Sequence, residues 1–401
     1  MKNKQIQKNI KKCRFCAAVG IFILVLALSA VFGWASFETH NFSWFWITKQ
    51  TQPVEFVSSE MPKIELQVAH VQTPEEVRGI YWTAYTAAGP RVYELTQYML
   101  ANDLNSVVID LKLDGGELVF KPKDENLEKF MLRGEIIKDL DGLLFALHEN
   151  GIYCIARLPV MRDSTFASLN PDQALQNSGG SLWKDATGAK WNDPVSEKAS
   201  DYATALAKEA YSRGFDEVQF DYVRFPSDGR LATIQYPLYK ETMAQTEVMQ
   251  AFFKKIGEAM KESDIPSSFD LFGMTFWSSG GFGIGQTLAG VYPYADYISP
   301  MVYPSHYPAG FEGYRNPADF PYEIVNMSLD KGAEQLVAES EIPEVESRPK
   351  FRPWLQSFHI GAVYDAQKID AQIRASRDAG ASGWLLWNAR NVYGEIEMVN
   401  N

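Results

Sequence analysis

An aspartate at the end of an apolar, strand-like segment is the residue best suited to chemistry in this sequence. Residues 217–226 read EVQFDYVRFP, with Asp221 in the middle and Arg224 three residues later. A charged side chain on a buried strand is costly unless it is paired or functional. The carboxyl end of a strand is also where a (β/α)8 barrel places its active site. We therefore predict that Asp221 is catalytic, with a structural ion pair to Arg224 as the alternative.

Polar residues also lie at the carboxyl ends of other strand-like segments. Residues far apart in sequence are therefore expected at the same end of the barrel. If the alternating faces of these strands point inward, Asp110 and Asp221 look into the same cavity. Glycoside hydrolysis requires two such carboxyl groups, because one protonates the leaving oxygen and the other attacks or activates water. We predict Asp221 and Asp110 as the catalytic pair. The predicted substrate-binding residues are Asp114, Arg157, Asp163, Arg224, Tyr303, His306, Gln356, Trp387 and Asn388.

Some of these residues also have a purely structural interpretation. Asp114 precedes Gly115 and Gly116, which is typical of a turn. Asp163 lies in a loop where an aspartate more often caps a helix or fixes a turn. Asp110 could simply pair with Lys112 two residues later. Aromatic side chains suit sugars, whose apolar faces stack on rings, and the long segments 161–194 and 304–350 could wall a groove with Trp183, Trp191, His306, Tyr307 and Tyr314.

The elements that position these residues alternate between strand-like and helix-like runs from residue 77 onward. Eight apolar segments are predicted as strands, which are 78–82, 106–111, 152–160, 217–225, 269–276, 297–303, 351–358 and 383–388. Strands that are apolar over their whole length are expected when both faces of a parallel sheet are covered. We predict an α/β fold, a (β/α)8 TIM barrel, preceded by an N-terminal transmembrane helix and a linker. An open, doubly wound sheet is the alternative, although no G-x-G-x-x-G follows the first strand.

The amino terminus has the pattern of a targeting segment. Residues 1–16 carry six Lys or Arg and no acid, and an apolar run follows. We predict a basic cytoplasmic segment at 1–16, a transmembrane signal anchor at 17–34, a linker or stalk at 35–76 and the barrel at 77–401. The barrel would then be extracytoplasmic, in a single-pass cell-membrane protein held by its N-terminal helix. Secretion after cleavage of a signal peptide is the alternative.

Composition limits the chemistry and the partners. The formal net charge is −12, and it is −18 once residues 1–16 are set aside, which argues against nucleic acid as a partner. There are five His without an H-E-x-x-H pattern, and no G-x-S-x-G or Walker motif occurs. We therefore expect no cofactor and no catalytic metal. The expected partner is a polysaccharide or oligosaccharide substrate.

The blocks GIYWTAYTA, SVVIDLKLDGG, IARLPVMRD, KWNDP, EVQFDYVRFP, SPMVYPSHY, RPWLQSF and GWLLWNARNVY occur in this order between residues 79 and 393. In this order they resemble a bacterial family of glycoside-hydrolase-like TIM barrels that is known as a domain of unknown function. The resemblance implies an exported, often membrane-tethered, carbohydrate-active barrel, distantly related to α-amylase-like and other retaining glycosidases. It also implies that Asp221 occupies the position where many such enzymes keep a catalytic carboxylate on the fourth strand.

The sequence departs from the α-amylase pattern at the fifth strand. FDLFGMTFW carries no acid at its carboxyl end, where those enzymes place one. The second carboxylate is then expected from Asp110, Asp114 or Asp163. Two alternatives stay open. One is a non-catalytic sugar-binding barrel at the cell surface. The other is a metal-assisted hydrolase in which Asp110, Asp114 and Asp221 hold Ca2+ or Mg2+.

Overall fold

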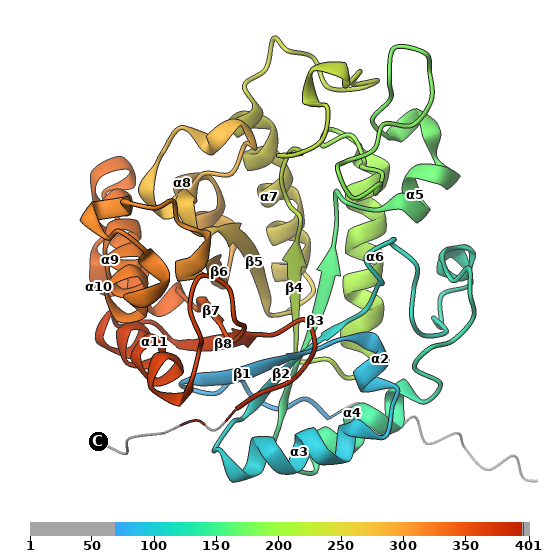
Figure 1. Cartoon of the computed structure of the whole chain (residues 1–401). Coiled ribbons are helices and arrows are strands. Elements are labelled where there is room, and N and C mark those ends of the chain that lie inside the picture. The colour runs from blue at the N-terminus through green and yellow to red at the C-terminus, as the bar shows by residue number, and fades with distance from the viewer. Residues whose placement is uncertain (1–68, 395, 397–401) are drawn as a thin grey trace, which may run out of the picture. The chain divides into compact units, whose positions relative to one another are not determined.

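Eight parallel strands close into a barrel in the computed structural model, which describes residues 69–394 and residue 396 (Figure 1). Neighbours pair in chain order, and β8 closes the barrel against β1. The strands are β1 Val77–Trp82, β2 Ser106–Asp110, β3 Tyr153–Pro159, β4 Glu217–Asp221, β5 Ser267–Phe272, β6 Tyr297–Met301, β7 Trp354–Gln356 and β8 Gly383–Trp387. The predicted (β/α)8 barrel is confirmed.

Helices surround the strands, and several of them join one strand to the next (Figure 1). The longer helices are α3 Arg91–Ala101, α4 Leu140–His148, α6 Glu197–Arg213, α7 Gln245–Lys261, α9 Pro321–Ser340 and α11 Ala366–Asp378. Shorter helices are α2 Ala84–Ala87, α5 Ser164–Leu169, α8 Leu288–Val291 and α10 Glu344–Ser347. The loops also carry 3-10 turns, among them η4 Gly273–Trp277 after β5 and η7 Pro304–His306 after β6.

The predicted transmembrane segment at 17–34 lies outside the described residues, as does most of the predicted linker. Within residues 69–394 and 396, no helix combines the length and apolarity that a membrane crossing requires.

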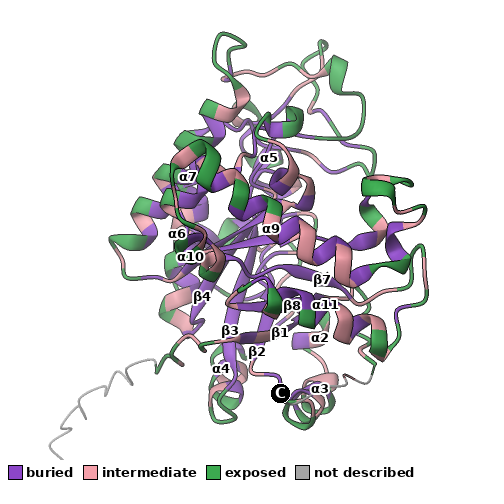
Figure 2. Cartoon of the chain, turned by 90° about the vertical axis from the view of Figure 1, so that its left-hand side faces the viewer, coloured by how far each residue is buried: buried purple, intermediate pink, exposed green. Residues whose placement is uncertain are grey.

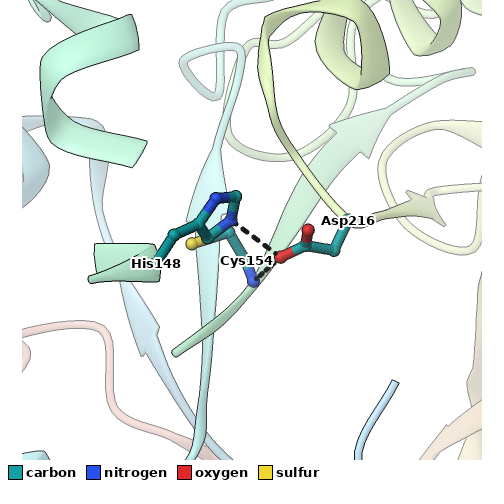
Figure 3. A group of neighbouring side chains, drawn as sticks. All are labelled: His148, Cys154 and Asp216. Atoms are coloured by element: carbon teal, nitrogen blue, oxygen red, sulfur yellow. Dashed lines mark hydrogen bonds and ion pairs between the residues drawn. The ribbon is translucent and has the colours of Figure 1, made fainter. Parts of the chain in front are cut away.

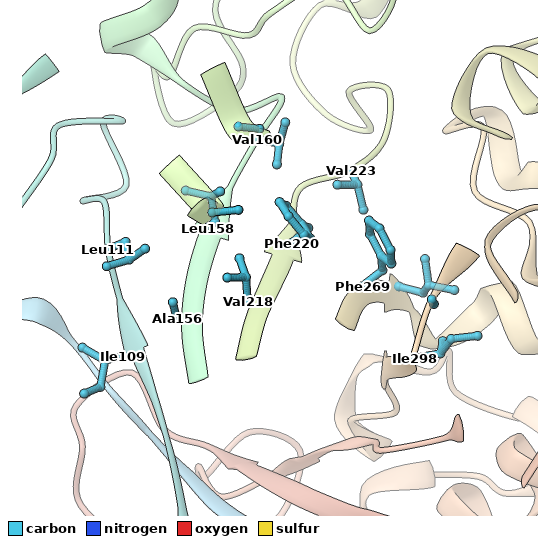
Figure 4. Packing of buried hydrophobic residues seen from close by; sticks show 14 of the residues in the cluster. Ile109, Leu111, Ala156, Leu158, Val160, Val218, Phe220, Val223, Phe269 and Ile298 are labelled. Atoms are coloured by element: carbon cyan, nitrogen blue, oxygen red, sulfur yellow. The ribbon is translucent and has the colours of Figure 1, made fainter. Parts of the chain in front are cut away.

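The main core lies between the strands and the helices. Figure 2 shows that the strands are buried and that exposed residues gather on the outer faces of the helices. Outward-facing residues of adjacent strands, such as Ile109, Ala156 and Phe220, pack in this layer (Figure 4). The layer covers the outer face of each strand, which explains the uninterrupted apolar runs in the sequence. A second cluster, which includes Tyr81, Val108 and Trp354, fills the barrel interior.

Buried charges at the amino-terminal end of the barrel are neutralised in place. Arg352 donates to Glu217 at 2.7 Å, and both side chains are fully buried. Asp216, just before β4, accepts hydrogen bonds from the backbone N–H groups of Cys154 and Val71 at 2.7 and 2.8 Å. The second of these bonds fastens the segment that precedes β1 to the barrel.

The fourth strand ends earlier than the sequence predicts. The apolar pattern predicts a strand as far as residue 225, whereas β4 ends at Asp221. Tyr222 adopts φ 52°, a left-handed conformation that is costly for a residue with a bulky side chain. The chain therefore leaves the barrel directly after the aspartate, and Asp221 becomes the last residue of its strand.

Candidate active site

A single guanidinium joins the two predicted catalytic aspartates. Arg157 on β3 donates from Nη1 to Asp110 Oδ1 at 2.7 Å. It also donates to Asp221 Oδ2, from Nε at 3.0 Å and from Nη2 at 2.5 Å. All three side chains are buried. The register explains the meeting, because Arg157 pairs with Asp110 across β2–β3, and β3 lies between the strands that carry the two acids. The structure thus joins the two predicted acids through Arg157, although only Asp221 of the two lines the cavity described below.

Both carboxylate oxygens of Asp110 have protein partners. The Tyr81 hydroxyl donates to its Oδ2, and Trp387 stacks on the Tyr81 ring with centroids 4.1 Å apart. Burial raises the pKa of Asp110, and the positive charge of Arg157 opposes this change. Each carboxylate oxygen of Asp110 is therefore engaged by a protein donor, and one of these bonds holds Arg157.

Asp221 borders a cavity at the carboxyl ends of β3 to β8. Its other oxygen, Oδ1, accepts the Tyr222 N–H at 2.6 Å, a bond that the turned backbone at Tyr222 makes possible. In each of these hydrogen bonds the Asp221 carboxyl oxygen is the acceptor. The cavity holds about 190 Å3 and is lined by Arg157, Asp221, Tyr222, Arg224, Asp270, Phe272, Met301, Tyr303, Trp354 and Trp387.

A second carboxyl group, Asp270 on β5, lines the same cavity. Its Oδ1 accepts a hydrogen bond from Trp354 Nε1 at 2.8 Å, and the residue is 2% exposed. Burial raises the pKa of Asp270 well above its usual value, and the charge of Asp221 on the adjacent strand raises it further. Two carboxyl groups with different environments therefore border one cavity. Asp221 makes an ion pair with Arg157, whereas Asp270 makes no ion pair with any of the described residues.

Asp270 was not among the predicted site residues, because an acid was expected only at the carboxyl end of the fifth strand. That strand runs Ser267–Phe272, so Asp270 lies two residues before its end and shares the face of Ser268 and Phe272. The signal was present, since a lone acid in the apolar run SSFDLF is as costly as Asp221 in its own run.

Three of the predicted substrate-binding residues besides Arg157 line this cavity, which are Arg224, Tyr303 and Trp387. Arg224 is 6% exposed and contacts the ring of Phe272, with the guanidinium 4.4 Å from the ring centroid. Burial lowers the pKa of Arg224, and the charge of Asp221 opposes this change. Burial also raises the pKa of Tyr303 well above its usual value, so its hydroxyl stays protonated.

A larger, more open groove of about 790 Å3 lies beside β7 and β8. Trp387 lines both this groove and the cavity, so the two are adjacent. His306 and Asn388 also line the groove. Burial lowers the pKa of His306, which favours a neutral imidazole. The Asn388 amide donates to the carbonyls of Ser357 and Val392, so it also holds the surrounding loops.

The remaining predicted residues do not line either space. Gln356 is fully buried, and its amide accepts the Ser305 N–H and donates to the carbonyls of Phe358 and Ile360. Asp163 is fully buried, pairs with Lys112 at 2.6 Å and caps α5. Asp114 is exposed at a turn, and its carbonyl accepts a bond from Arg162. The hydrogen bonds of these residues stabilise loops, and their side chains line neither the cavity nor the groove.

The aromatic residues of the long loops divide between support and surface. Trp191 is 1% exposed and packs on Arg224 with 5.1 Å between the guanidinium and the ring centroid, so it supports the site from behind. Trp183 is equally buried, against Gly229. The ring of Tyr307 is buried and hydrogen-bonded to Ser328. Trp384 is fully buried in the outer core, whereas Trp387 lines the site, as their positions on β8 predict.

A separate group of donor atoms lies at the opposite end of the barrel. Figure 3 shows His148, Cys154 and Asp216, whose potential ligand atoms all lie within 4.8 Å of one another. His148 Nε2 and the Cys154 N–H both contact Asp216 Oδ2, at 3.0 and 2.7 Å. Burial and the charge of Asp216 raise the pKa of the Cys154 thiol well above its usual value, which disfavours the thiolate that a metal requires. The group is accounted for by its hydrogen bonds.

A closed (β/α)8 barrel in which two carboxyl groups on adjacent strands border one cavity is the arrangement that TIM-barrel glycoside hydrolases use. Residues 79–393 match the family model described as "Putative glycosyl hydrolase domain", and the chain belongs to this family. This confirms the resemblance drawn from the sequence blocks.

Solved structures of other proteins are similar to this chain. The glycoside hydrolase domain of PgaB (BpsB) from Bordetella bronchiseptica is 14% identical with a TM-score of 0.54, over 78% of this chain and 94% of that one. A hypothetical protein from Ruminiclostridium thermocellum is 25% identical with a TM-score of 0.43, over 48% of this chain and 96% of that one. No curated protein sequence matches the chain.

Proposed function

We propose that this protein hydrolyses glycosidic bonds of a polysaccharide, with Asp221 as the nucleophile or base and Asp270 as the acid. One observation carries the proposal. The two carboxyl groups line one cavity, yet Arg157 binds Asp221, whereas Asp270 is buried without a cation and its pKa is raised. In glycosidases, two carboxyl groups in such different environments take the roles of acid and base.

The chemistry follows from these environments. The raised pKa of Asp270 favours its protonated form, which gives a proton to the oxygen of the leaving sugar. Asp221 carries the negative charge that stabilises the developing oxocarbenium ion, and it either attacks the anomeric carbon or takes a proton from water. Trp387 and Tyr303 supply ring surface for the apolar faces of the sugar. Arg157 keeps Asp221 oriented through its two donated hydrogen bonds.

Asp270 replaces Asp110 as the second carboxyl group in this proposal. Both oxygens of Asp110 accept hydrogen bonds from Arg157 and Tyr81, and it is not part of the cavity lining. The sugar-binding alternative was favoured by the missing acid on the fifth strand, and Asp270 removes that argument. In the metal-assisted alternative an ion would sit between Asp110 and Asp221, where the guanidinium of Arg157 lies instead.

Activity of the full-length protein on a panel of cell-wall and storage glycans, measured by release of reducing ends, tests the proposal. Asp221→Asn is expected to lower kcat by at least about 100-fold, as removal of a catalytic carboxylate does. Asp103→Asn is the matched control, because Asp103 lies on an exposed turn before β2. Equal hydrolysis by wild type and Asp221→Asn would remove Asp221 from catalysis, and glycan binding without turnover by wild type would favour the sugar-binding barrel.

The location of the barrel is part of the proposal. The basic residues 1–16 and the apolar run after them support a membrane anchor with the barrel outside the cytoplasm. A reporter that is active only outside the cytoplasmic membrane, fused after residue 401, is expected to be active. An inactive reporter in cells that fold the fusion would contradict this location.

A further inference from the structure

Arg224 is an exception among the buried cations of the barrel. In residues 69–394 and 396, four Lys or Arg residues are buried, which are Lys112, Arg157, Arg224 and Arg352. Three of them pair with carboxylates at 2.5 to 2.7 Å, namely with Asp163, with Asp110 and Asp221, and with Glu217. Arg224 has no carboxylate within 4.0 Å in the described part of the chain. A buried cation that makes no direct ion pair is costly, even with the charge of Asp221 nearby, so its retention calls for an explanation.

The contacts of Arg224 leave one edge of its guanidinium without an acceptor. Nη1 donates to the Phe225 carbonyl and to Ser227 Oγ, each at 3.0 Å. Within the described residues, Nε and Nη2 make no hydrogen bond. These two groups form the edge that binds a carboxylate through two parallel hydrogen bonds. Phe272, Trp191 and Tyr222 surround the guanidinium, with their ring centroids 4.4, 5.1 and 5.4 Å away, so the side chain is held in place.

Support of Asp221 does not account for this arrangement. Arg157 already donates two hydrogen bonds to Asp221, whereas Arg224 donates none to it. Arg224 nevertheless lines the cavity that Asp221 and Asp270 border. That cavity, at about 190 Å3, is smaller than the roughly 300–1,000 Å3 of sites for drug-sized ligands, so it suits one sugar unit.

We propose that the sugar unit bound beside Asp221 and Asp270 carries a carboxylate, and that Arg224 binds this carboxylate through Nε and Nη2. The substrate is then an acidic glycan, whose carboxylate belongs to a uronic acid or to a carboxyl-bearing ether on the ring. This inference rests on the proposed glycosidase function and specifies its substrate class. The net charge of −12 disfavours a polyanion at long range, so recognition depends on this local cation.

The test compares an acidic oligosaccharide with the same molecule after its carboxyl groups are reduced to alcohols. Wild type is expected to prefer the acidic form. Arg224→Gln is expected to raise KM for the acidic form about 10- to 100-fold, the range for loss of a charge-assisted hydrogen-bonded pair, and to change KM for the reduced form less than threefold. Arg224→Lys keeps the positive charge but cannot donate two parallel hydrogen bonds. Its KM for the acidic form should therefore lie between the values of wild type and Arg224→Gln. Arg374→Gln is the surface control, since its partner Asp370 lies one helical turn away on α11.

Other outcomes overturn the inference. Equal use of acidic and reduced substrate by wild type, or an equal loss of kcat on both in Arg224→Gln, would assign Arg224 a structural role. Separate arms with a uronic-acid glycan, a carboxyl-ether glycan and a sulfated glycan identify the source of the charge, and preference for the sulfated glycan would refute the carboxylate. If wild type hydrolyses nothing, calorimetric binding to the acidic but not the reduced glycan would retain the anion site while the glycosidase proposal fails. If the protein binds neither the acidic nor the reduced glycan, both the anion site and the glycosidase proposal are refuted.

Discussion

Replacing Asp270 with asparagine is expected to make the protein more stable and less active. In wild type the pKa of Asp270 is raised well above 3.8 by burial and by the charge of Asp221. Between 3.8 and the folded-state pKa, the unfolded chain loses this proton while the folded chain keeps it. The folded state then binds more protons, so the stability of wild type falls as the pH rises through this window. Asparagine does not titrate, so the variant lacks this loss.

The size of the effect follows from linkage. The free energy of unfolding of Asp270→Asn, relative to wild type, should increase by about 1.4 kcal/mol for each pH unit above 3.8 and level off above the folded-state pKa. The asparagine Oδ1 can still accept the hydrogen bond that Trp354 Nε1 donates at 2.8 Å, so the local packing is kept. The difference between the two proteins therefore reports the carboxyl proton and little else.

Urea denaturation at pH 4.5, 5.5, 6.5 and 7.5 measures this difference. Asp103→Asn, which removes a charge from an exposed turn, should differ from wild type by less than about 0.5 kcal/mol at every pH. On glycans, Asp270→Asn should lower kcat by about 100- to 10,000-fold, with a much smaller loss on aryl glycosides whose leaving group needs no proton. A difference in stability that does not depend on pH would refute the raised pKa. An equal loss on both substrate types would refute the acid role.

Two further buried arginines separate catalysis from stability. Arg157→Met leaves Asp110 and Asp221 without their cation. We expect urea denaturation to show a loss of about 3–5 kcal/mol in the free energy of unfolding. We expect glycan hydrolysis assays to show no turnover. Arg352→Met leaves Glu217 unpaired at the other end of the barrel, so it should cost a similar free energy while the folded fraction keeps wild-type kcat. Loss of kcat in folded Arg352→Met would mean that the two ends of the barrel are coupled.

The fold was predictable because it depends on patterns that repeat along the chain. Each strand is an apolar run covered on its outer face, so all eight were found, with ends misplaced by a few residues. The end of β4 was misplaced for a local reason. The run VQFDYVRF continues past Asp221 in composition, and only the positive φ of Tyr222 ends the strand, which residue type alone did not reveal.

The site was predictable only in part, because side-chain contacts depend on register and loop geometry. Asp110 and Asp221 lie on the two strands that flank β3, so alternation predicted that they approach each other, but it did not predict that Arg157 lies between them. Gln356 and Asn388 also lie at strand ends, yet their amides hold loops whose paths the sequence does not reveal. Asp270 was overlooked because it lies inside its strand, and its depth in the barrel is what raises its pKa.

The two ends of the barrel differ in how their buried ionisable groups are paired. At the amino-terminal end, Glu217 is paired with Arg352, and Asp216 accepts backbone and histidine donors. At the carboxyl end, Asp270 has no cation and Arg224 has no carboxylate within the described residues, yet the two line one cavity and do not neutralise each other. Each costs folding free energy that a simple substitution would recover. At one end the fold pairs its buried charges, whereas at the other it retains a buried acid whose raised pKa favours the neutral form and a buried cation without an ion pair among the described residues. This contrast supports our proposal that the carboxyl end, with Asp270 and Arg224, binds the substrate.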